Sequence, residues 1–157
     1  MTGMNAMGSR SVTQDIDSFT EPLTFQVLIR LQHLRSRLRD LTACASAQEP
    51  RNDQIEEVRW ALLGMAIAAR SAGLGSYTQV CMHLAQQVEH LRSNSQLHWS
   101  FLTELGVWLA SSGRYLRHPD NPGVVAELVG RLNVLCGDSP MSRDEESRWF
   151  RALLQPH

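Results

Sequence analysis

Lysine is missing from this chain of 157 residues, so all fifteen of its Lys and Arg positions are arginine. This absence excludes a Walker-type phosphate loop, Schiff-base chemistry and any catalytic lysine. The three cysteines, Cys44, Cys81 and Cys136, are scattered without CxxC spacing. Because a disulfide framework or a zinc site needs paired or clustered cysteines, we expect free thiols that are mostly buried.

Long hydrophobic runs and a strong net charge are missing as well. Hydrophobic residues make up 43% of the chain and the net charge is −1, which is typical of a single globular domain. We predict no membrane insertion and a cytoplasmic location, because no membrane-helix run and no signal-peptide core are present. The charge does not favour nucleic acid, and we interpret Arg30, Arg35, Arg37 and Arg39 as a solvated helix face.

Motifs of catalytic or metal sites are not found. The chain has six histidines, but no HxxxH, HExxH, GxSxG or Cys–His signature. His83 and His90 are seven residues apart on one predicted helix, about 10 Å by helix rise, too far for one zinc ion. We therefore predict no catalytic residue, no metal and no cofactor, and expect that the protein is not an enzyme.

Apolar residues recur at spacings of three and four along most of the chain, which predicts an all-α fold. We expect an antiparallel four-helix bundle of short connections with two additional C-terminal helices. The predicted inward residues, helix by helix, are Val27, Leu31, Leu34, Leu38 and Leu41; Ile55, Val58, Leu62, Met65, Ala69 and Ala72; Tyr77, Val80, Leu84, Val88 and Leu91; Phe101, Leu105, Trp108, Leu109 and Leu116; Val125, Leu128, Val129, Leu132 and Leu135; and Trp149, Phe150, Leu153 and Leu154.

Three segments follow from this pattern. Residues 1–19 are polar and small, so we predict a flexible N-terminal segment ahead of a helix that begins at Pro22. Residues 20–117 form the predicted four-helix bundle. Residues 118–157 form a predicted C-terminal helical extension that packs on the bundle.

The second helix carries more apolar surface than a bundle helix needs. Besides its inward stripe it has a second stripe, Trp60, Leu63 and Ile67, turned away from the first. A helix in a small domain needs one apolar face only, so something must cover the second one. What covers this stripe is the main functional question.

The stretch RWALLGMAIAARSAGLG, residues 59–75, resembles the histidine phosphotransfer (Hpt) domains of bacterial phosphorelays, especially those of chemosensory kinases. The family pattern is H-x-L-K-G-x-A, with a Gly-Leu or Gly-Phe pair ten residues after the histidine. Aligning that pair with Gly73–Leu74 places the phospho-acceptor position at Leu63. The lysine and glycine of the pattern then fall on Ala66 and Ile67. An alternative register places Trp60 at the acceptor position, and neither register has a histidine there.

The resemblance covers residues 23 to 116 and implies a four-helix bundle whose second helix docks receiver domains. It does not imply phosphotransfer, because leucine cannot be phosphorylated. We therefore predict a non-catalytic adaptor that binds a receiver or histidine kinase domain of two-component or chemosensory signalling. The predicted partner-binding residues are Arg59, Trp60, Leu63, Ala66, Ile67 and Arg70.

Three alternatives stay open at this point. The C-terminal helices could fold back and bury the second stripe, with Trp149 and Phe150 as the covering side chains. The stripe could instead form a homodimer, which would make the protein a structural interaction module. A third alternative is active phosphotransfer through a non-standard histidine such as His83.

Overall fold

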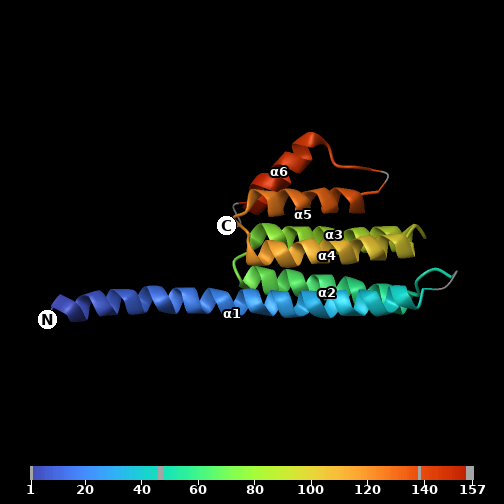
Figure 1. The fold of residues 1–157 in the computed structure, drawn as a ribbon. Helices are drawn as coiled ribbons and strands as arrows, with labels where there is room; N and C mark the ends of the chain where they lie inside the picture. The colour runs from blue at the N-terminus through green and yellow to red at the C-terminus, as the bar shows by residue number, and fades with distance from the viewer. Residues whose placement is uncertain (1, 46–47, 138, 155–157) are drawn as a thin grey trace.

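The computed structural model describes residues 2–45, 48–137 and 139–154, with side chains from Leu23 onward. Six helices and no strand occur in these ranges (Figure 1), so the predicted all-α class is confirmed. No helix within them is long and apolar enough to span a membrane. The helices are α1 (Thr2–Ala43), α2 (Asn52–Ser71), α3 (Gly75–Ser93), α4 (Trp99–Arg117), α5 (Pro122–Leu135) and α6 (Arg143–Leu154).

The helices pack as two rows of three. One row is α1–α4–α5 and the other is α2–α3–α6, and the rows are joined at their ends by the α1–α2 and α5–α6 contacts. No Cα–Cα approach within 8 Å joins α3 to α4 in the described helices. The expected four-helix arrangement is therefore not confirmed, because α5 and α6 complete one six-helix bundle instead of lying outside a closed one.

Large aromatic side chains separate α3 from α4. The Tyr77 ring of α3 stacks on both Trp108 and Tyr115 of α4, with ring centroids 5.9 and 5.8 Å apart. All three side chains are fully buried. Because aromatic rings need centroid separations of about 4.5–7 Å, a layer of them between two helices prevents close backbone approach. The space between the two rows is thus filled by side chains.

The predicted apolar stripes form the core of this bundle. Every predicted inward residue of the first, second and fifth helices is buried. The exceptions are partly buried residues near one end of α3, near the start of α4 and on α6: Leu91, Phe101, Trp149, Phe150 and Leu154. The periodicity therefore identified the core residues, and its misses lie where the helices are less tightly covered.

The first helix is longer than predicted. It begins at Thr2, not at Pro22, and its N-terminal part projects beyond the other helices (Figure 1). The apolar spacing located only the part of the helix that packs on its neighbours, since a helix without neighbours needs no apolar stripe. The flexibility predicted for residues 1–19 stays a prediction.

Candidate protein-docking surface on α2

The second apolar stripe of α2 lies on the outside of the bundle. Trp60 is 62% exposed and Ile67 is 70% exposed, whereas Leu63 is half-buried and packs against the core. We call these three residues the α2 face. They project from a helix whose opposite side is fully buried, so the backbone that carries them is held in place by the core.

The C-terminal helices do not cover the α2 face. Among the described helices α6 contacts only α5 and α3. The Trp149 ring lies 6.5 Å from the His83 ring of α3, and Phe150 lines a groove between α6 and α5. The alternative in which the C-terminal helices bury this stripe is therefore wrong for this structure. Trp60 and Ile67 remain solvent-exposed among the residues that the structure describes.

A glycine lies in the middle of the α2 face, and an arginine of α1 borders it. Gly64 is one turn from Trp60 and Ile67, and a Cβ atom built on it would lie 3.0 Å from Arg30 Nη1. The guanidinium of Arg30 therefore reaches over the helix at the point where it carries no side chain. The sequence alone gave no reason to place Arg30 here, because the contact joins two helices.

An ion-pair network between α2 and α3 forms the opposite border. Arg59 pairs with Glu56 at 3.0 Å and with Glu89 of α3 at 3.8 Å. Arg92 lies 3.9 Å from Glu56 and also hydrogen-bonds to Glu89, a contact that lowers the pKa of the Glu89 carboxyl. Each of these partly exposed ion pairs contributes little to the free energy of unfolding. Together they restrict the positions of the four side chains.

Arg59 also holds the orientation of Trp60. Its guanidinium carbon lies 5.0 Å from the centroid of the indole, a cation–π distance. The hydrogen bond from Arg59 to Glu56 raises the pKa of the guanidinium, which therefore stays charged. The indole is thus exposed but positioned, which lowers the entropy cost of binding something against it.

The other two predicted site residues, Ala66 and Arg70, differ in outcome. Ala66 is only 3% exposed and belongs to the core, so it cannot contact a partner. The prediction for Ala66 is wrong because its side chain turns toward the core and not toward solvent. Arg70 is exposed and makes no ion pair in the part of the chain that the structure describes.

One residue of this surface was missed at the sequence level. The Arg59–Glu89 and Glu56–Arg92 pairs set an antiparallel register that places Met82 of α3 opposite the segment between Leu63 and Ile67. Met82 is 46% exposed. Its place beside α2 depends on how two helices pack, which the spacing within one helix cannot show. Flexible methionines adapt well to varied binding partners.

Three of the six histidines share one groove. His83, His90 and His98 line an open groove of about 870 Å³ between α3, α4 and the α5–α6 connection. No group of three or more His, Cys, Asp or Glu side chains that could hold a metal ion occurs among the described residues. His83 is exposed on α3, with its ring against Trp149 and away from the α2 face.

No known protein family, curated protein or solved structure matches the chain.

Proposed function

We propose that this protein acts by binding another protein through the α2 face. The observation that carries the proposal is the exposure of Trp60 and Ile67 on a helix whose other side is fully buried. Scattered exposed apolar residues are ordinary on protein surfaces, but adjacent large ones on one rigid face are typical of interaction sites. Tryptophan surrounded by arginines is also the composition in which binding energy concentrates.

The partner class that the Hpt resemblance implies is a receiver or histidine kinase domain. The protein would then be an adaptor of two-component or chemosensory signalling that binds without transferring phosphate. The alignment that places Leu63 at the acceptor position implies no transfer, since leucine cannot be phosphorylated, and the Leu63 side chain packs against the core. Homodimerisation through the same face is the competing use of this surface.

Capture of a protein partner should depend on the α2 face. Ile67→Glu places a charge on the apolar α2 face, so we expect at least a tenfold loss of captured partner in affinity purification from the native cells. Val134→Glu is the matched control, because Val134 is 50% exposed on α5. Leu63→Glu is the poorer probe, since the half-buried Leu63 side chain packs against the core and its loss would also destabilise the fold.

The outcomes of this comparison are distinct. Equal capture by wild type and Ile67→Glu would contradict the proposal. If wild type is instead a dimer by light scattering and Ile67→Glu is a monomer, the face joins two copies of this chain. The free energy of unfolding of both variants should lie within about 0.5 kcal/mol of the wild-type value, since surface substitutions rarely change it by more.

Phosphotransfer through His83 is tested by labelling. After incubation with an active histidine kinase or a phosphorylated receiver, we expect no acid-labile phosphate on this protein. A label that disappears in His83→Gln but persists in His90→Gln would overturn the non-catalytic proposal. His90→Gln is the matched control, because both histidines are exposed and line the same groove.

A further inference from the structure

Several arginines pair with an acidic side chain on a neighbouring helix. Arg37 of α1 pairs with Glu57 of α2 at 2.6 Å, and Arg114 of α4 pairs with Glu127 of α5. Arg35 and Arg39 of α1 are different. Neither guanidinium makes an ion pair or a hydrogen bond in residues 23–45, 48–137 and 139–154. The α4-facing side of α1 therefore carries two arginines without an ion-pair partner among the described residues, one helical turn apart.

These two arginines line a groove between α1 and α4. The groove has a volume of about 280 Å³, and its other lining residues are apolar, small or hydroxyl-bearing, with no carboxylate among them. Leu38 and Leu102 supply buried apolar atoms. A Cβ atom on Gly106 would meet nothing within 4 Å, so the groove is open above this glycine. An uncharged, open floor thus lies beside two guanidinium groups.

We propose that the α1–α4 groove binds a phosphate monoester carried on a small organic molecule. Arginine guanidinium groups are planar forks that bind phosphate oxygens in pairs, and two of them match the charge of a phosphate dianion. Like charges one turn apart on a helix repel each other, and a bound dianion removes that repulsion. The apolar floor takes the organic part of the ligand, and a groove of about 280 Å³ has room for one ring.

Phenyl phosphate is the probe, and amide chemical shifts of the full chain are the measurement. We expect saturable shifts in α1 around Arg35 and Arg39 and in α4 around Gly106. Phenol, which lacks the charge, should give none, and benzenesulfonate, with one charge, should bind more weakly. Lowering the pH below about 6 should weaken binding, because the phosphate dianion then takes up one proton and becomes a monoanion.

Two substitutions decide whether the arginines form a site. Arg35→Gln and Arg39→Gln should each weaken binding of phenyl phosphate at least about tenfold, since each removes charge-assisted hydrogen bonds. Arg131→Gln, on the exposed surface of α5, should leave binding unchanged. All three variants should keep the wild-type melting curve. The proposal is overturned if shifts do not saturate, if Arg131→Gln weakens binding equally, or if benzenesulfonate binds as tightly as phenyl phosphate.

Discussion

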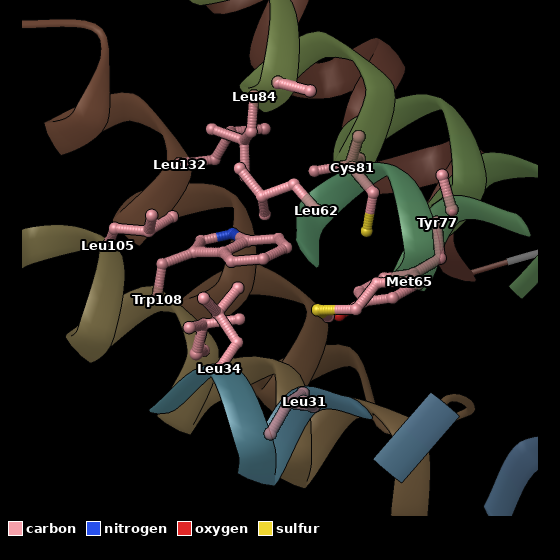
Figure 2. Close-up of a cluster of buried hydrophobic side chains, with 14 of the residues drawn as sticks. Leu31, Leu34, Leu62, Met65, Tyr77, Cys81, Leu84, Leu105, Trp108 and Leu132 are labelled. Atoms are coloured by element: carbon pink, nitrogen blue, oxygen red, sulfur yellow. The ribbon is translucent and has the colours of Figure 1, made fainter. Parts of the chain in front are cut away.

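Replacing Trp108 with alanine is expected to lower the free energy of unfolding by about 3–5 kcal/mol. Trp108 is fully buried, and Figure 2 shows its indole among Leu34, Leu62, Leu84 and Leu132, which come from α1, α2, α3 and α5. No single neighbouring helix can move into the space without losing contacts elsewhere. The cavity should therefore persist, so the surrounding side chains recover little of the lost packing energy.

One feature of Trp108 reduces this cost. Its indole Nε1 is buried without a hydrogen-bond partner in the described part of the chain, so the substitution also removes an unsatisfied donor. A buried unpaired donor costs about 1–3 kcal/mol, although a side chain this large loses far more through packing. Urea denaturation followed by circular dichroism measures the difference.

Trp60→Ala is the matched control, because it removes the same atoms from an exposed position. Trp60 is on the same bundle but 62% exposed, so we expect a change within about 0.5 kcal/mol. A loss comparable to that of Trp108→Ala would mean that something covers the α2 face, as in a dimer. Comparing the two variants therefore tests both the core and the exposure on which the proposed function rests.

Periodicity predicted the core because the buried residues of a helix recur every three or four positions in the sequence. The second helix shows this on both sides, since Leu62 and Met65 are buried as predicted while Trp60 and Ile67 are exposed. The spacing separated the two stripes correctly. It could not show whether the second stripe is covered, because that depends on the position of α6 in space.

The arrangement of the helices could not be predicted from the sequence for the same reason. Whether α3 packs on α4 depends on the size of Tyr77, Trp108 and Tyr115 at a contact between distant segments. The pairs across helices, such as Arg37–Glu57, follow from that arrangement and have no spacing rule within a helix. Only pairs such as Glu56–Arg59, three residues apart, are predictable from sequence.

The sixth helix should detach without unfolding the rest when its buried anchor is charged. Leu153 is the fully buried residue of α6, and its carbonyl accepts the Tyr115 hydroxyl at 2.7 Å. Grooves lie on both sides of α6, one against α5 and one against α3 and α4, so its packing is incomplete. A short helix held at few points can unfold as a local unit.

Leu153→Asp would place an unpaired carboxylate in the core if α6 stayed docked, at a cost of several kcal/mol. Undocking α6 avoids that cost, so the loss of stability cannot exceed the free energy with which α6 is held. We therefore expect amide exchange of α6 to approach that of an unfolded peptide while α2 stays protected. Leu62 lies on α2 at the centre of the core, where undocking of one terminal helix cannot expose the new carboxylate. We therefore expect Leu62→Asp to unfold the whole bundle. Loss of protection in α2 as well as α6 in Leu153→Asp would show instead that all six helices unfold as one unit.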